Sequence, residues 1–207
     1  VYKRQVLAAS FHKNNITFSI EGYYKYTDGI TRYISFPQHN IENIVSGTSR
    51  SFGMDVFLQG TLKRHSAWIA YSLSKTEEYF NYFIDSEYRR APQDQRHEIK
   101  LALLLNFNPF YFSSNYVYGS GFPFKPATIV ADDSDNLDYS RLDISFIYKF
   151  LDRKMKGEIG LSILNILNTQ NIKYTNFERI PATQQSSITV YAEAIPFTPT
   201  LYFKIAL

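Results

Sequence analysis

The chain has 207 residues, a formal net charge of +3 and no cysteine, and it contains 17 tyrosines and 17 phenylalanines. Without cysteine, a disulfide framework, a cysteine-ligated zinc site and a thiol nucleophile are excluded. The small net charge gives no argument for nucleic acid as a partner. No apolar run approaches the ~18 residues of a membrane helix. One membrane class remains, the β-barrel, because its strands are only half apolar.

The first five residues, Val1–Gln5, are set apart from the fold prediction. They include no initiator methionine and no signal peptide, so we expect them to be an upstream remnant or an artefact. Residues 6–207 are expected to form part of one larger domain.

A period of two dominates the rest of the chain. Apolar and polar residues alternate, as in Leu142-Asp-Ile-Ser-Phe-Ile-Tyr148, and alternate side chains of a strand point to opposite faces. A helix would need a period of 3.6. About nine strands are predicted, at or near Val6–His12, Ile16–Tyr26, Ser51–Leu58, Trp68–Ser74, Glu98–Phe107, Phe110–Tyr118, Arg141–Phe150, Glu158–Ile163 and Ile195–Leu207.

The predicted connections alternate in length. Short ones fall at Lys13–Asn15, Gln59–Arg64, Asn108–Pro109 and Leu151–Lys156, and long ones at Asp28–Ser46, Phe80–Asp94, Ser120–Tyr139 and Leu167–Ser186. An up-and-down antiparallel sheet places every second connection at the same end. Bacterial outer-membrane barrels have this asymmetry, with short periplasmic turns and long extracellular loops. The fold class predicted is therefore all-β, an antiparallel up-and-down transmembrane β-barrel.

A soluble β-sandwich or barrel, such as a carbohydrate-binding module, is the alternative, because it also gives a period of two. Three features disfavour it. Its strands would be shorter, its loops would not need to alternate in length, and its polar face would carry more lysine and glutamate. We expect a single antiparallel meander with exposed edges, and a compact two-sheet sandwich would contradict this prediction.

Several segments together resemble one family. They are Gln95-Arg-His-Glu-Ile99, Tyr111-Phe-Ser-Ser-Asn-Tyr-Val-Tyr-Gly-Ser-Gly-Phe-Pro123, Tyr139-Ser-Arg-Leu-Asp-Ile144, Gly157-Glu-Ile-Gly-Leu-Ser-Ile-Leu-Asn-Ile-Leu-Asn168 and Pro196-Phe-Thr-Pro-Thr-Leu-Tyr-Phe203. In this order and spacing they look like the C-terminal part of the barrel of TonB-dependent outer-membrane receptors. One departure is the last residue, Leu207, where the family often has an aromatic residue.

The resemblance implies a fragment of a 22-stranded barrel with a plugged lumen. The chain would supply about nine of the strands, and the plug and the N-terminal barrel strands would be absent. The intact receptor would lie in the bacterial outer membrane among lipids, bind a scarce solute at the cell surface and import it with energy from the TonB complex. The TonB complex would bind through the missing N-terminal part. Siderophore, corrinoid, peptide and oligosaccharide all remain open as the solute.

Ligand contacts are expected in the long loops. Tyr79, Phe80, Tyr82 and Phe83 offer stacking surfaces for a sugar or an aromatic chelate, and Arg89 and Arg90 could attract an anion. The alternative is that these aromatic residues pack the loop or mark the membrane interface.

We find no catalytic constellation, so no enzyme activity and no cofactor are predicted. The four histidines have no metal-ligand spacing. The acidic run Asp132-Asp-Ser-Asp-Asn-Leu-Asp138 lacks the glycine and closing glutamate of an EF-hand. It is interpreted as a solvated loop, with a cation-binding loop as the alternative.

Overall fold

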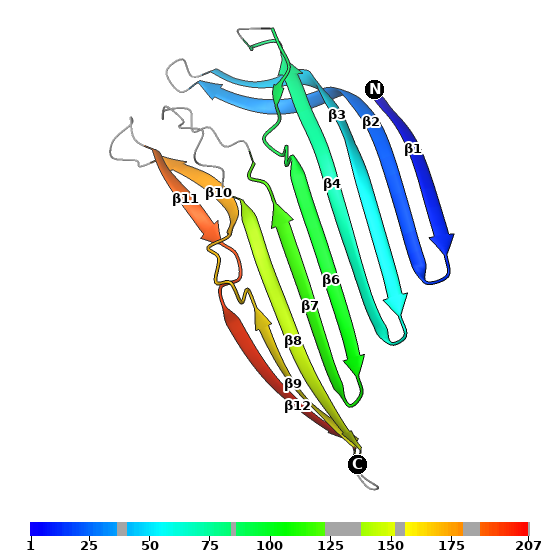
Figure 1. Ribbon diagram of the computed structural model, residues 1–207. Coiled ribbons are helices and arrows are strands. Elements are labelled where there is room, and N and C mark those ends of the chain that lie inside the picture. Colours follow the sequence, from blue (N-terminus) through cyan, green and yellow to red (C-terminus); the bar gives the residue numbers. More distant parts are fainter. Residues whose placement is uncertain (37–40, 84–85, 123–137, 152–155, 180–186, 207) are drawn as a thin grey trace. The chain divides into compact units, whose positions relative to one another are not determined.

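The computed structural model describes residues 1–36, 41–83, 86–122, 138–151, 156–179 and 187–206 (Figure 1). These residues form strands and no helix. The strands are β1 (Tyr2–Lys13), β2 (Ile16–Phe36), β3 (Ile41–Leu62), β4 (His65–Phe80), β5 (Arg89–Arg90), β6 (His97–Phe107), β7 (Phe110–Gly119), β8 (Tyr139–Leu151), β9 (Lys156–Leu164), β10 (Ile172–Arg179), β11 (Ser187–Glu193) and β12 (Thr198–Ala206). In the part of the chain that is described, no helix is long and apolar enough to cross a membrane.

The main sheet is an antiparallel meander. Its order is β1-β2-β3-β4-β6-β7-β8-β9-β12, with β5 paired to β4, while β10 and β11 form a separate two-stranded sheet. Over the described residues the order begins at β1 and ends at β12, so the sheet does not close on itself. The predicted all-β, up-and-down antiparallel arrangement is confirmed, and a sandwich of two comparable sheets is not what the strand order shows.

Three of the predicted short turns are confirmed. The strands on either side are joined through Asn14 and Asn15, Lys63 and Arg64, and Asn108 and Pro109. Asn14 and Lys63 adopt positive φ angles of 52° and 55°, the left-handed conformation that tight hairpin turns require. Most of the fourth predicted turn, Leu151–Lys156, lies outside the described residues.

The predicted long loops are corrected in two places. The segment Asp28–Ser46 was expected to be a loop, but β2 continues to Phe36 and β3 starts at Ile41. Asp28-Gly29 looks like a turn signal, yet Gly29 stays within the strand at a φ of +84°, because glycine tolerates such a local irregularity. The expected loop Leu167–Ser186 likewise contains β10. Most of the loop Ser120–Tyr139 lies outside the described residues.

The first and the last strand both begin at residues other than those predicted. The first strand starts at Tyr2, which pairs with Thr27, so residues 2–5 belong to β1 although the sequence analysis set them apart. The last strand starts at Thr198 rather than Ile195, where its pairing with Leu164 at the end of β9 begins.

By its contacts the chain divides into two compact units, each described separately below. Unit 1 comprises Val1–Leu58, Ala70–Glu98 and Ser120–Asn136, and unit 2 comprises Gln59–Ile69, Ile99–Gly119 and Leu137–Leu207.

In unit 2, the register of β7, β8, β9 and β12 gathers most of the large apolar residues on one face. The opposite face carries most of the polar residues, together with Tyr111, Val117, Ile147 and Tyr202. The apolar face carries Phe110, Phe112, Leu142, Ile144, Phe146, Tyr148, Ile159, Leu161, Ile163, Pro199, Leu201 and Phe203. The polar face carries Ser113, Asn115, Arg141, Asp143, Ser145, Lys149, Glu158, Ser162, Thr200 and Lys204. Large side chains of the apolar face are exposed, with 74% exposure at Leu201, 60% at Phe203 and 46% at Phe146.

Candidate functional site

The six residues predicted to contact a ligand lie at the end of β4 and in the loop that follows it, all within unit 1. Four aromatic rings meet there. The ring centroid of Phe83 lies 5.7 Å from Phe80, 5.0 Å from Tyr82 and 6.3 Å from Tyr79. A fifth ring, Tyr88, lies 5.9 Å from Tyr79. We call Tyr79, Phe80, Tyr82, Phe83 and Tyr88 the aromatic cluster.

Arginines cover three of these rings. The guanidinium carbon of Arg32 lies 4.7 Å from the Phe80 ring centroid, and that of Arg89 lies 4.5 Å from the Phe83 centroid. Arg50 lies 4.1 Å from the centroid of Tyr88. Cation–π contacts of this kind contribute about 0.5–1 kcal/mol at exposed sites and more when they are desolvated. Arg32 also donates a hydrogen bond to the Tyr82 hydroxyl at 3.1 Å.

Two buried glutamates neutralise Arg32 and Arg50. Glu78 accepts a hydrogen bond from Arg32, and Glu77 pairs with Arg50 at 2.8 Å and with Lys75 at 2.5 Å. Burial raises the pKa of the Glu77 carboxyl, but the hydrogen bonds from Lys75 and Arg50 outweigh it and hold the pKa below its usual 4.5. Buried charges need such partners, because an unpaired one is costly to desolvate.

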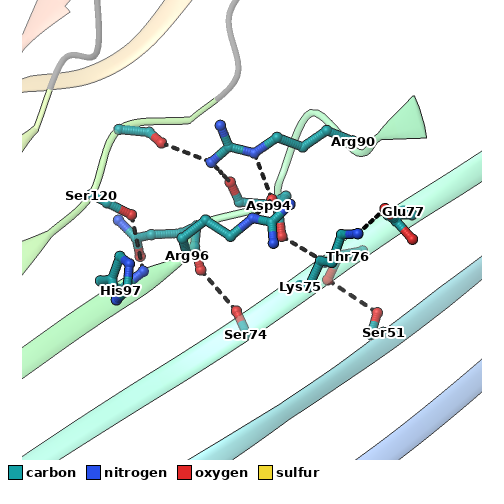
Figure 2. A network of polar contacts seen from close by, with 12 residues as sticks. Ser51, Ser74, Lys75, Thr76, Glu77, Arg90, Asp94, Arg96, His97 and Ser120 are labelled. Carbon is teal, nitrogen blue, oxygen red and sulfur yellow. Dashed lines mark hydrogen bonds and ion pairs between the residues drawn. The ribbon is translucent and has the colours of Figure 1, made fainter. Parts of the chain in front are cut away.

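Asp94 fastens the loop after β4 to that strand (Figure 2). Its carboxylate accepts hydrogen bonds from the Thr76 backbone N–H at 2.5 Å, from Arg90 Nε at 2.6 Å and from Arg96 Nε at 2.8 Å. The Asp94 side chain is fully buried, whereas each arginine side chain is 32% exposed. The backbone N–H of Ala91 donates to the Thr76 carbonyl at 2.9 Å. We call these contacts the Asp94 network.

A glycine on β3 allows the chain to pack this closely. A Cβ atom added at Gly47 would lie 2.3 Å from the Tyr79 carbonyl oxygen and 2.6 Å from a ring carbon of Phe80. Any larger residue at position 47 would therefore push against the backbone of β4. The close approach leaves Phe80 only 1% exposed.

The structure brings the predicted aromatic residues together but assigns most of them to packing. Phe80 and Phe83 are 1% and 7% exposed, so their faces are covered by the chain itself. Tyr82 is 40% exposed, and Arg89 is exposed as well. Arg90 holds Asp94. The outward-facing part of the predicted site is therefore Tyr82 together with Arg89.

The charged residues that surround the aromatic cluster were not predicted from the sequence. Arg32 and Arg50 come from β2 and β3, and Glu77 and Glu78 come from β4. The one available signal was the pair of adjacent glutamates just before four aromatic residues. The arginines that pair with them are 27 and 46 positions away, a separation at which sequence spacing carries no information.

The rest of the described chain adds no catalytic or metal-binding geometry. Among the described residues, no group of three histidine, aspartate or glutamate side chains is placed to hold a metal ion. The imidazole rings of His12, His65 and His97 hydrogen-bond with Thr17, the Asn106 backbone N–H and Tyr71, respectively. Most of the acidic run Asp132–Asp138, and His39, lie outside the described residues.

Comparison of the chain with known protein families, with curated proteins and with solved structures finds no match in any of the three.

Proposed function

We propose that this chain is part of a TonB-dependent outer-membrane receptor, a barrel protein that binds a scarce solute at the bacterial cell surface and imports it into the periplasm. The observation that carries the proposal is the apolar face of unit 2. Leu201, Phe203 and Phe146 are each at least 46% exposed on that face. Exposed apolar surface in contact with water is unfavourable by about 25 cal/mol per Å², and lipid removes this cost.

The opposite face supports the same environment. It carries serine, threonine and asparagine together with a few charged residues, such as the Arg141–Asp143 pair at 2.7 Å. Transmembrane barrels have an apolar exterior and a polar interior that alternate along each strand. In this proposal the apolar face would lie against lipid and the polar face would line the lumen.

The lengths of the strands also support a barrel of this class. β6, β7 and β8 have 11, 10 and 13 residues, and a tilted strand needs about 9–11 residues to cross the hydrocarbon region. The proposed spanning segments are the parts of the strands that carry the apolar face. The end of β4 from Lys75 onward and the loop that contains the Asp94 network would lie outside the membrane.

The family itself is proposed from the resemblance of the segments given above, from Gln95–Ile99 to Pro196–Phe203. Within that proposal, Tyr82 and Arg89 are the exposed residues among the six predicted contacts. An aromatic ring suits a sugar ring, and a guanidinium suits an anionic chelate. Siderophore, corrinoid, peptide and oligosaccharide would be compared as solutes by binding to the intact gene product.

Cell fractionation tests the membrane location. We expect the full gene product to be found in outer membranes, to resist extraction by alkaline carbonate and to require detergent for solubilisation. A monodisperse product in the aqueous fraction without detergent would reject the proposal and favour the soluble binding module.

A pair of adjacent substitutions tests which face meets lipid. Leu201 and Thr200 are both exposed, and they point to opposite faces of β12. We expect Leu201→Arg to lower the stability of the membrane-inserted protein by about 2–4 kcal/mol, the cost of arginine on the lipid face. Thr200→Arg should have a much smaller effect. Membrane insertion is read from heat-modifiable migration on gels. If both substitutions have equally small effects on insertion, the surface does not face lipid.

A further inference from the structure

A pocket of about 350 Å³ lies on unit 2 near the turn at Asn108. It is formed by the end of β8, the start of β9 and the end of β12. Its lining includes three lysines, Lys149, Lys156 and Lys204, together with Glu158 and Tyr111. Three ammonium groups and one carboxylate leave a formal charge of +2 in this small space. This pocket is separate from the aromatic cluster and the Asp94 network, which belong to unit 1.

The register explains how the charges gather. Glu158 on β9 lies directly across from Lys149 on β8 and from Lys204 on β12. The three side chains therefore form one row on the polar face. Lys156 lies two residues before Glu158 on the same strand and points to the same face. Opposite charges across neighbouring strands attract, which favours this arrangement of Glu158 between two lysines.

The lysines are not consumed by ion pairs. Among the residues that the structure describes, no salt bridge within 4.0 Å involves Lys149, Lys156 or Lys204. Lys149 Nζ lies 4.7 Å from the ring centroid of Tyr111, which holds it over that wall of the pocket. All three lysines are exposed, so their hydrogen-bond donors can reach a ligand.

The choice of cation indicates the ligand chemistry. The buried carboxylates of unit 1 are held mainly by arginines, as at Glu78 and Asp94, and the planar guanidinium fork matches a carboxylate. The pocket instead presents ammonium groups, which bind phosphate oxygens as rotatable point charges. A group with two negative charges would also match the formal charge of +2.

We propose that this pocket binds a phosphate-bearing ligand, with Lys149, Lys156 and Lys204 donating to its oxygens. The ligand could be a free phosphomonoester or a lipid whose headgroup is a phosphomonoester, and both would present the same dianionic group. The inference does not depend on the receptor proposal, because the pocket is formed within unit 2 by strands whose register is established.

The test uses the full gene product in a detergent without phosphate, such as dodecyl maltoside, at low ionic strength. Inorganic pyrophosphate is titrated and its binding followed by ³¹P NMR and calorimetry. We expect saturable binding that weakens roughly tenfold in Lys204→Gln and is lost in Lys149→Gln/Lys204→Gln. The double variant Lys3→Gln/Lys13→Gln on β1 changes the net charge equally but lies in unit 1, so it should bind normally. Lys204→Arg should retain most of the affinity.

A second arm identifies the source of the phosphate. If phosphatidic acid in nanodiscs displaces pyrophosphate and neutral phosphatidylcholine does not, the pocket takes a lipid headgroup. If neither lipid displaces it, the ligand is a free phosphate compound. The proposal is overturned if neither pyrophosphate nor phosphatidic acid binds saturably, or if both lysine double variants lose binding to the same extent.

Discussion

Hydrophobic side chains are buried in the loop after β4 but exposed on the sheet formed by β7, β8, β9 and β12. All buried hydrophobic side chains among the described residues, Phe80, Phe83 and Ala91, belong to that loop or to the end of β4. The sheet of unit 2 instead leaves Leu201 and Phe203 exposed. The loop is a small closed core within its unit, whereas the sheet presents an apolar face that its own unit does not cover.

The difference shows that stability has separate sources in the two regions. In the loop, charged hydrogen bonds around Asp94 and Glu77 hold the chain, and each contributes more than a neutral one. In the sheet, the backbone ladder and the medium that contacts the apolar face must carry most of the stability. Substitutions in the loop should therefore act in any solvent, and substitutions on the apolar face should act according to the solvent.

The largest effect is expected from Asp94→Ala. The change leaves the Thr76 N–H without its acceptor and removes the carboxylate that Arg90 and Arg96 share. Because the two arginines are partly exposed and can be rehydrated, we expect a loss of about 3 kcal/mol, near the low end for a broken buried pair. Trypsin cleavage after Arg89, Arg90 and Arg96 should accelerate on the order of a hundredfold.

The exposed Asp138 is a matched control for that experiment. It accepts one hydrogen bond from Tyr118 in unit 2. Asp138→Ala should leave cleavage in the loop unchanged. If Asp94→Ala cleaves no faster than Asp138→Ala, the Asp94 network does not hold the loop closed.

The next effect concerns the close packing of β3 against β4. Gly47→Ala places a methyl group 2.3 Å from the backbone oxygen of Tyr79, so the strands must move apart. We expect destabilisation by about 1–3 kcal/mol, measured by denaturant unfolding in detergent. At Gly22 an added Cβ has no neighbour within 4 Å, and Gly22→Ala should be neutral. Equal midpoints for the two variants would contradict the close approach.

A smaller loss of stability is expected when a glycine of the unit 2 sheet, Gly160, is replaced by alanine. An added Cβ at Gly160 would lie 2.1 Å from a ring carbon of Tyr202, but that ring belongs to an exposed strand and can swing aside. Gly160→Ala should therefore cost less than about 1 kcal/mol, below the cost of Gly47→Ala in the same unfolding assay. A larger loss at Gly160 would mean that the polar face of the sheet is as rigid as the loop.

The smallest effect is a dependence of loop stability on pH. The pKa of Glu77 is lowered in the folded state, so its contribution is present above about 4.5 and is lost as the pH falls through the lowered value. Because trypsin is inactive at such low pH, opening of the loop is followed by cleavage with pepsin. Cleavage should rise below pH 4.5 in the wild type and depend less on pH in Glu77→Gln. The same slope in both proteins would assign the effect to another carboxyl group.

Much of the sheet could be predicted from sequence, because alternation is a local signal. The segment Leu142–Phe146 alternates without a break, and the observed register places Leu142, Ile144 and Phe146 on one face. Asp28-Gly29 misled the prediction, since the same pair that terminates many strands is accommodated here within β2. The strand β10 was missed because its alternation reverses parity between Tyr174 and Phe177.

The candidate site was predictable only in part. The run Tyr79–Phe83 has four rings within five positions, and these rings lie against one another in the structure. Their burial could not be foreseen, because it depends on Gly47 and on Arg32, both from distant strands. The availability of an aromatic residue for a ligand is thus a tertiary property, and composition does not report it.

The strand β1 has one neighbour in the sheet order, and this has a consequence for hydrogen exchange. In an antiparallel pair, successive residues direct their N–H groups alternately toward the partner strand and away from it. Along Tyr2–Lys13, which pairs with β2 throughout, every second amide should therefore exchange slowly and its neighbours quickly. A strand added at this edge would protect the fast half. The exchange pattern of twelve consecutive residues is thus a direct readout of whether the edge is occupied in the intact protein.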